Sequence, residues 1–314
     1  MDDKGTSIYI ISMNTLNTIA NGINYFGKEG FPILLGRSIT NPKPESPKSH
    51  PYDLTEVQHS HDFCELVVVT QGQGKQWIDG VEFSIMTGDV FLQQGGQRHF
   101  FFDRDNLEMA NIMYDAERLK LPEKKLRCMP GYCAMFLLEP SYRKEHKFAS
   151  KLHLNPIKVA HVQGICDEIE VECVTHPPGF EVILQAKLLE LITYLSRAYV
   201  ETTTTESQAL LRVGMVISAM ENKLTNNWKL NDLASIANMS TSNLLTVFRK
   251  ATDETPIDYL MRLRIHHAME LLRQSDRTIT SIAYDTGFRD SNYFTRQFKK
   301  IVGIPPRQFR RKYT

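Results

Sequence analysis

The sequence has little cysteine, no long apolar run and almost no net charge. Its 314 residues include five cysteines, none of them in C-x-x-C spacing. An odd number without that spacing argues against a disulfide framework and against a zinc knuckle, and it favours free thiols in a reducing compartment. No apolar stretch approaches the ~18 residues of a membrane span, and the N-terminal apolar run is too short for a signal peptide. We therefore expect a cytoplasmic protein without a membrane partner.

The net charge of +1 hides an uneven distribution. Residues 206–314 hold 17 Lys and Arg against 10 Asp and Glu, whereas the rest of the chain holds 20 against 26. A basic C-terminal third joined to an acidic remainder predicts a polyanionic partner for that end only. The length is sufficient for two domains of ordinary size.

Changes of hydropathy pattern organise the first two thirds of the chain. Residues 1–56 form an N-terminal segment that is irregular where Pro, Ser and Lys accumulate. Short strand-like runs over 57–114, separated by Gly, Asp and Asn, predict an antiparallel barrel or sandwich. Helical periodicity then predicts one amphipathic helix over 156–173 and another over 180–200. We expect one domain at 57–200, in which helices follow a β-barrel.

A linker separates this domain from an all-helical one. The stretch TTTTES interrupts the helical pattern and has the composition of a flexible connection, which we place at 201–207. Ser207 is a candidate N-cap for the helix that follows. Residues 208–314 are predicted to be helices joined by short turns. The expected fold class is therefore α+β with two domains.

The helical domain contains an internal repeat of two similar segments. Segments 230–250 and 279–300 each combine a short helix, a turn and a longer helix, which is the order of a helix-turn-helix. Ser240 and Asp290 stand at the N-caps of the longer helices, whose free N–H groups can face phosphate. The intervening helix, about 256–273, spans roughly 25–30 Å, close to the ~34 Å between successive major-groove sites. One chain is therefore expected to read two successive grooves of double-stranded DNA.

The second copy resembles the AraC/XylS family of bacterial regulators. It carries GF at 287–288, SNYF at 291–294, FKK at 298–300 and G-x-x-P at 303–306. The resemblance implies a transcription regulator, more often an activator than a repressor, that works with RNA polymerase at the bacterial nucleoid. A helical protein–protein module with a basic surface is the alternative interpretation of the same helices.

By position, the family implies base-edge contacts on both longer helices. The candidates are Ser242, Asn243, Thr246, Ser291, Asn292 and Arg296. Arg suits guanine and Asn suits adenine in the major groove. Because the first helix has no Arg among its candidates, we expect the second to discriminate bases more sharply. The apolar positions at i, i+3 and i+4 spacing, such as Leu244 and Phe294, are expected to pack in the core.

Histidines and a glutamate mark the barrel segment. His59, His61 and Glu65, followed by His99, resemble the two cupin motifs, although Gln94 replaces the proline of the second motif. Alternation along one strand places residues 59, 61 and 65 on one face, and His99 can come from a facing strand. Such a set suits a divalent transition metal. We nevertheless expect hydrogen bonds to a polar effector, with no metal and no cofactor.

Aromatic residues and a closer resemblance suggest a sugar as that effector. Trp77 and Phe101 are expected near the barrel mouth, where they can stack on a sugar ring or simply pack. The stretches HDFCELVVV, GDVF and NIMYDAERLKL look like the L-rhamnose operon activators of the AraC/XylS family. The resemblance implies a small carbohydrate effector, with L-rhamnose as the first candidate. We call the barrel domain the sensor and the helical DNA-binding domain the reader. Effector binding can shift the equilibrium between two arrangements of sensor and reader only if the effector binds the two arrangements with unequal affinity.

The two helices after the barrel are expected to form a homodimer interface. The helix at 180–200 offers its Leu/Ile stripe for this purpose, whereas the helix at 156–173 can equally pack on its own barrel. We expect a regulator rather than an enzyme, with two alternatives left open. One is a metal-dependent cupin dioxygenase or isomerase with a DNA-binding tail. The other is an effector-independent DNA-binding protein whose barrel serves only for oligomerisation.

Overall fold

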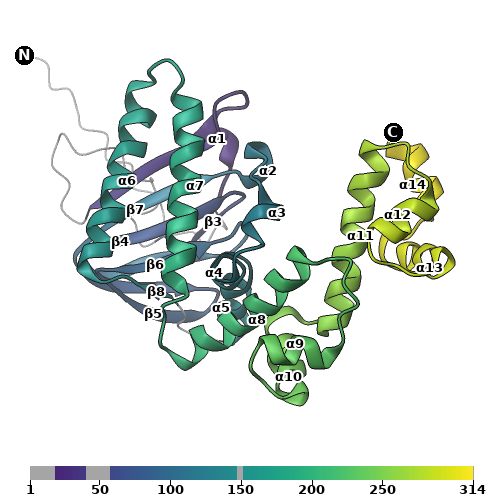
Figure 1. Cartoon of the computed structure of the whole chain (residues 1–314). Coiled ribbons are helices and arrows are strands. Elements are labelled where there is room, and N and C mark those ends of the chain that lie inside the picture. Colours follow the sequence, from purple (N-terminus) through teal and green to yellow (C-terminus); the bar gives the residue numbers. More distant parts are fainter. Residues whose placement is uncertain (1–17, 40–56, 147–150, 314) are drawn as a thin grey trace, which may run out of the picture.

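A computed structural model describes residues 18–39, 57–146 and 151–313. It confirms the two-part α+β architecture, with a β-barrel first and helices through to the C-terminus (Figure 1). Residues 1–17 and 40–56 of the predicted N-terminal segment lie outside the described residues. The described part of that segment forms β1 (Thr18–Ala20), α1 (Gly22–Phe26) and β2 (Ile33–Ile39).

Eight strands form one sheet that curls into the predicted barrel. The remaining strands are β3 (His59–His61), β4 (Cys64–Ile78), β5 (Val81–Met86), β6 (Asp89–Gln93), β7 (His99–Tyr114) and β8 (Leu152–His153). The long strands β4 and β7 pair antiparallel from Cys64–Tyr114 to Ile78–His99, with bulges between. The predicted antiparallel pattern has one exception, because β1 pairs parallel with β3. Since β2 pairs with β7, the sheet begins ahead of the boundary expected at residue 57.

Both faces of the central strand β4 are buried, which explains its unbroken apolar run. Val67 and Val69 point into the barrel, where they join a small apolar cluster with Phe91 and Phe101. Leu66 and the other outward residues belong to the main core. Two long helices, α6 (Pro156–Thr175) and α7 (Phe180–Tyr199), cover this outer face (Figure 1). Both agree closely with the helices predicted from periodicity.

Short helices connect the last long strand to β8. They are α2 (Ala116–Leu119), α3 (Glu123–Leu126), α4 (Pro130–Tyr132), the π-helix η1 (Cys133–Leu138) and α5 (Glu139–His146). The segment α4–η1 packs against α7 on one side and against α8 (Thr205–Asn222) on the other. Gly214 of α8 permits this approach, because a Cβ there would lie 2.5 Å from the carbonyl oxygen of Pro130. The sensor and the reader are therefore in close contact.

The linker expected at 201–207 is shorter in the structure. Helix α8 begins at Thr205, and its N-cap is Thr204, whose side chain accepts a hydrogen bond from the backbone N–H of Ser207. The expectation that Ser207 caps this helix was therefore wrong. Ser207 lies inside the first turn and is buried, while Thr204 supplies the hydroxyl acceptor that a helix start needs.

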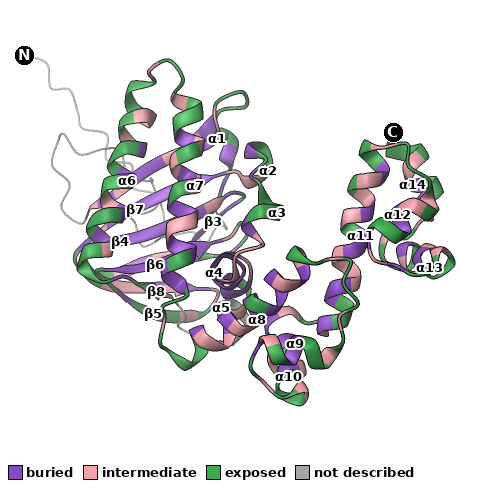
Figure 2. Cartoon of the chain, viewed as in Figure 1, coloured by how far each residue is buried: buried purple, intermediate pink, exposed green. Residues whose placement is uncertain are grey.

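The reader contains two matching helical units joined by one long helix. Its further helices are α9 (Leu230–Ile236), α10 (Thr241–Thr252), α11 (Pro256–Gln274), α12 (Ile279–Asp285), α13 (Ser291–Val302) and α14 (Pro306–Tyr313). The main hydrophobic core continues from the sensor through α8, α9 and α10 and ends at Leu260 on α11. A separate core begins at Ile265 and holds α12, α13 and α14 together (Figure 2). The first unit is thus packed on the sensor, whereas the second has a core of its own.

Candidate effector site and DNA-binding surface

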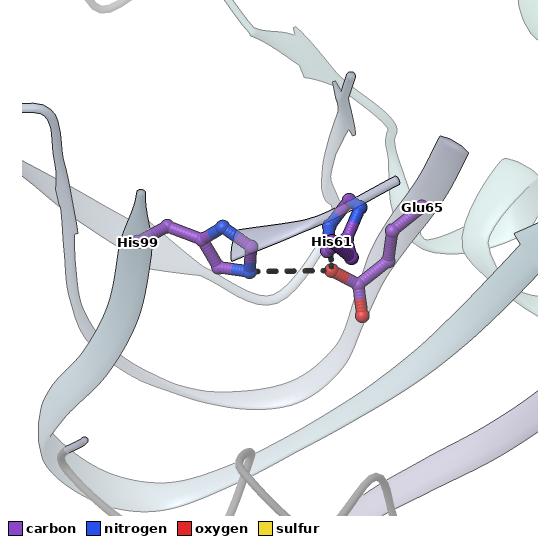
Figure 3. A group of neighbouring side chains, drawn as sticks. All are labelled: His61, Glu65 and His99. Carbon is purple, nitrogen blue, oxygen red and sulfur yellow. Dashed lines mark ion pairs between the residues drawn. The ribbon is translucent and has the colours of Figure 1, made fainter. Parts of the chain in front are cut away.

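Three of the predicted barrel residues converge on one point inside the barrel. Nε2 of His61 lies 3.4 Å from Oε2 of Glu65, and Nε2 of His99 lies 3.5 Å from the same oxygen (Figure 3). All three side chains are buried. They come from three strands, because β3 ends at His61 and β4 begins at Cys64. His99 starts the adjacent strand β7, where it pairs with His59, rather than a facing strand as expected.

The tautomers of the two histidines follow from their backbone contacts. Nδ1 of His61 lies 2.7 Å from the carbonyl oxygen of Phe63, and Nδ1 of His99 lies 3.0 Å from that of Gln97. A carbonyl oxygen only accepts, so each Nδ1 carries a hydrogen, and each ring directs its Nε2 toward the carboxylate of Glu65. Neither Nε2 has a hydrogen-bond partner in the structure, nor does either carboxylate oxygen of Glu65. The two imidazoles and the carboxylate therefore form one buried polar cluster.

The carboxyl group of Glu65 is ionised in this arrangement. Burial alone would raise its pKa, but the imidazoles of His61 and His99 hold the pKa of Glu65 well below its ordinary value. The three ligand atoms lie within 4.8 Å of one another, so this group has the composition to hold a divalent transition metal. The same atoms can equally form hydrogen bonds with the hydroxyl groups of a polar ligand, because a hydroxyl group both donates and accepts.

His59 lies beside this group, and Phe101 lies near it in the buried interior of the barrel rather than at the mouth. Nδ1 of His59 is 3.1 Å from the carbonyl oxygen of Val57, and its ring centroid is 4.4 Å from that of His99. The buried ring of Phe101 is 6.4 Å from the same imidazole and contributes to the apolar interior. Together these residues form a polar end of the barrel interior next to an apolar one.

The prediction that Trp77 lines the effector site was wrong. Its neighbours Gln76 and Ile78 are both buried, whereas Trp77 is only half-buried and packs on Phe100 at a centroid distance of 5.5 Å. Since successive side chains of a strand point to opposite faces, Trp77 lies on the outer face of the barrel. The face on which Trp77 lies depends on the register of its strand, which the amino-acid composition of the segment does not reveal.

Sequence reasoning missed three amide side chains of the interior. Gln76, Gln93 and Asn111 are at most 1% exposed. Gln93 is in register with Glu65 on the neighbouring strand β6, so their side chains share a face. Gln93 could have been identified from the sequence, because it is a polar residue that ends the otherwise apolar run VFLQ, and buried polar groups need hydrogen-bond partners.

The two recognition helices match each other closely. Helices α10 and α13 have the same length and, over their first ten residues, the same sequence of buried, half-buried and exposed positions; they differ at Ala251, which is buried, and Ile301, which is exposed. Ser240 and Asp290 cap them as predicted, accepting from the backbone N–H groups of Asn243 and Tyr293. Gly287 in the second turn has a positive φ, as does Asn238 at the matching position of the first turn. The backbone conformation therefore confirms the predicted repeat.

Most candidate base readers lie on the exposed face of these helices. Exposed positions are Ser242, Asn243, Thr246, Asn292 and Arg296. Ser291 is half-buried and begins α13. Tyr293 was expected on the outward face but not among the base contacts; it is 40% exposed and occupies the position that corresponds to Asn243. The guanidinium carbon of Arg296 lies 6.0 Å from the Tyr293 ring centroid, so the two side chains flank one surface.

A barrel with a buried polar cluster, joined to two exposed recognition helices, defines a ligand-responsive DNA-binding regulator. The family model of the AraC-like ligand binding domain matches residues 49–120, and the family model of the Helix-turn-helix domain matches residues 233–312. The chain thus combines an AraC-like ligand binding domain with the helix-turn-helix domain of a transcription regulator. It is a regulator and not an enzyme, so the cupin-enzyme alternative is not supported.

Similar curated proteins include the HTH-type transcriptional activator RhaR of Shigella flexneri and of Escherichia coli. Each is 28% identical over 262 residues, which cover 83% of this chain and 89% of the relative. Among solved structures, the C-terminal domain of the response regulator yesN from Fusobacterium nucleatum is 31% identical, with a TM-score of 0.29 over 30% of this chain and 93% of that one. Apo ToxT from Vibrio cholerae is 13% identical, with a TM-score of 0.33 over 90% of this chain and 98% of that one.

Hydropathy along the described helices gives one further result. Across residues 18–39, 57–146 and 151–313, no helix is long and apolar enough to cross a membrane.

Proposed function

We propose that this regulator activates transcription in response to a small neutral carbohydrate, with L-rhamnose as the first candidate, bound inside the barrel. The observation that carries the proposal is the buried group of His61, Glu65 and His99, whose facing atoms have no hydrogen-bond partner in the structure. Buried polar atoms without partners destabilise a fold, and a sugar hydroxyl supplies what they need. The resemblance to the L-rhamnose operon activators supports the choice of sugar.

The proposed DNA contacts follow from exposure and chemistry. Ser242, Asn243 and Thr246 would read one major groove, and Asn292 and Arg296 the next, with Ser291 at the edge. Helix α11 has 19 residues, so it spans about 28 Å at ~1.5 Å per residue. This length suits two successive grooves. The only candidate reader with a guanidinium is Arg296, which supports the second helix as the more discriminating one.

The proposed homodimer needs a different surface from the one first expected. The Leu/Ile stripe of α7 is buried within its own chain, with Leu188 at 0% exposure, so it cannot be the contact. Exposed apolar side chains instead gather where α6 ends and α7 begins. They are Val171, Val174, Val182 and Ile183. We propose this group, called here the hairpin patch, as the dimer contact of a cytoplasmic, nucleoid-associated activator that works with RNA polymerase.

Transcription in vitro tests the proposal. The full chain, RNA polymerase and a promoter template from a genomic binding site would be assayed with and without L-rhamnose. We expect more transcript with the sugar, and a higher unfolding temperature, since a ligand at 100 times its Kd adds ~2.7 kcal/mol to the stability of the native state. Specific DNA binding without stabilisation by any sugar would instead favour the effector-independent regulator.

A further inference from the structure

We infer that an open cleft between the two units of the reader binds a phosphate group of the DNA backbone, with Lys223 and Arg289 as its cationic partners. The inference goes beyond the proposed base contacts, because it assigns a site that reads no base. It uses the helix-turn-helix character of the reader and does not depend on the carbohydrate proposed for the barrel.

The cleft lies where the two units of the reader approach each other. On one side is the loop that joins α8 to α9, and on the other is the turn that joins α12 to α13. The volume of the cleft is about 620 Å³. Since neither unit forms the cleft alone, a group bound in it contacts both units at once.

The buried Arg264 of α11 holds the loop of the first unit in place. Its Nε donates to the carbonyl oxygen of Leu224 at 3.0 Å, and its Nη2 donates to that of Asn226 at 2.7 Å. Its guanidinium carbon also lies 6.0 Å from the ring centroid of Phe288, in the turn of the second unit. One side chain therefore contacts both walls of the cleft, so the lining is arranged before any ligand binds.

The lining has the chemistry of a phosphate site. Lys and Arg, together with Thr, Asn and Tyr, are among the side chains that contact phosphate oxygens in protein–DNA complexes. The cleft is lined by exposed side chains of these types, and no carboxylate of the described residues lines it. They are Lys223, Thr225, Asn226, Asn227, Tyr284 and Arg289. Such a surface attracts an anion and offers a cation no partner.

The two cations of the cleft are available to a ligand. In the described part of the chain, neither Lys223 nor Arg289 forms an ion pair. The carboxylate next in sequence, Asp290, is already engaged, because it caps α13 and accepts from the backbone N–H of Tyr293. A phosphate between the two cations would therefore gain charge-assisted hydrogen bonds without displacing an existing partner.

The position of Arg289 connects the cleft to the DNA-reading surface. Met239 in the first turn and Phe288 in the second occupy matching positions, since the backbone N–H of each donates to the carbonyl oxygen five residues earlier. The N-cap of the recognition helix follows Met239 directly, whereas Arg289 stands between Phe288 and the N-cap. The second turn thus has an additional, exposed Arg beside the start of α13. A phosphate on the backbone between the two grooves can reach it.

A cycle of protein and DNA changes tests the inference. The full chain would bind duplexes from a genomic binding site, each with one methylphosphonate, which removes the charge of a single phosphate. At a position between the two reading sites, we expect the unaltered chain to lose affinity roughly tenfold. The double variant Lys223→Gln/Arg289→Gln should lose much less there, because its contact is already gone. On natural DNA, each single variant should lower the salt slope by about 1 for all sequences alike.

Arg197→Gln is the matched control for net charge. Arg197 is exposed in the last turn of α7, in the sensor, so this variant should keep both the full methylphosphonate effect and the salt slope. Arg289→Lys retains the charge and should keep most of the effect. Unfolding temperatures report whether each variant is folded.

Two results would overturn the assignment of a DNA phosphate to the cleft. One is an equal methylphosphonate loss for the double variant and the unaltered chain at every position. The other is stabilisation of the chain by inorganic phosphate that the double variant lacks, without coupling to any phosphate of the DNA; the cleft would then bind a free anion. Both results leave specific DNA binding and the response to a sugar intact, so they are distinguishable from a failure of the proposed function.

Discussion

Gln97 donates a hydrogen bond from its Nε2 to the carbonyl oxygen of Pro140, 3.2 Å away. Gln97 lies in the turn that leads into His99, and its own carbonyl oxygen accepts from Nδ1 of that histidine. In the same turn, Gln94 donates to the carbonyl oxygen of Phe136 in η1. Since η1 packs against α8, a single turn connects the wall of the candidate effector site to the first helix of the reader.

This connection predicts that Gln97→Met uncouples sugar binding from the DNA response. Methionine keeps the length of the side chain but cannot donate to Pro140, so a shift at His99 would no longer reach α5. We expect the affinity for the neutral sugar to change less than threefold, while the effect of the sugar on transcription is largely lost. Titration and transcription in vitro measure the two quantities. A full response in Gln97→Met would show that coupling takes another route.

Arg296→Ala is expected to weaken specific DNA binding by ~1–3 kcal/mol and to relax sequence preference in one groove. The matched control is Lys299→Ala on the same exposed face of α13, which should weaken binding to all sequences alike and lower the salt dependence. Binding assays on a cognate site and on a scrambled site separate the two effects. Unchanged affinity of Arg296→Ala for the cognate site would remove it from the base readers.

The reassigned dimer contact leads to opposite expectations for two apolar positions. Leu188→Ala opens a cavity in the core and should lower the free energy of unfolding by ~2–5 kcal/mol without a specific effect on association. Val174→Asp, at a side chain that is 70% exposed, should leave stability nearly unchanged and weaken the dimer. Sedimentation and thermal unfolding measure these quantities. A dimer that resists Val174→Asp and Val182→Asp together would exclude the hairpin patch.

Gly287 connects the two units of the reader through a close approach. A Cβ there would lie 2.8 Å from Cα of Thr225 and 3.0 Å from Cζ of Arg264, and φ is +86°. Arg264 in turn donates to the carbonyl oxygens of Leu224 and Asn226. We expect Gly287→Ala to destabilise the reader by ~1–3 kcal/mol.

Gly303→Ala isolates the conformational part of that effect. Gly303 has a similar φ of +85°, but nothing lies within 4 Å of the position of its Cβ, so only backbone strain of ~1–2 kcal/mol is expected. Thermal unfolding of both variants gives the comparison. Equal losses would mean that the contact with Thr225 and Arg264 contributes nothing.

Local patterns were enough to predict the reader. The caps at Ser240 and Asp290, the apolar spacing and the helix between the units all depend on residues within a few turns of one another, so a linear sequence carries them. The convergence of His61 with Glu65 was predicted from alternation along one strand, but the structure places the two residues on the separate strands β3 and β4. The sequence did not predict which element packs on each apolar face. A stripe such as that on α7 shows which side of the helix is buried but not what covers it.

Long-range pairing of the strands decided the rest. His99 reaches Glu65 only because β7 pairs with β3 and β4 around the barrel, and the same register turns Trp77 outward and Gln93 inward. A shift of one residue would exchange the two faces, so the lining of the site depends on contacts between residues far apart in the chain. The reader thus follows from local sequence, whereas the effector site and the buried α7 stripe follow from the closure of the sheet and the packing of helices on it.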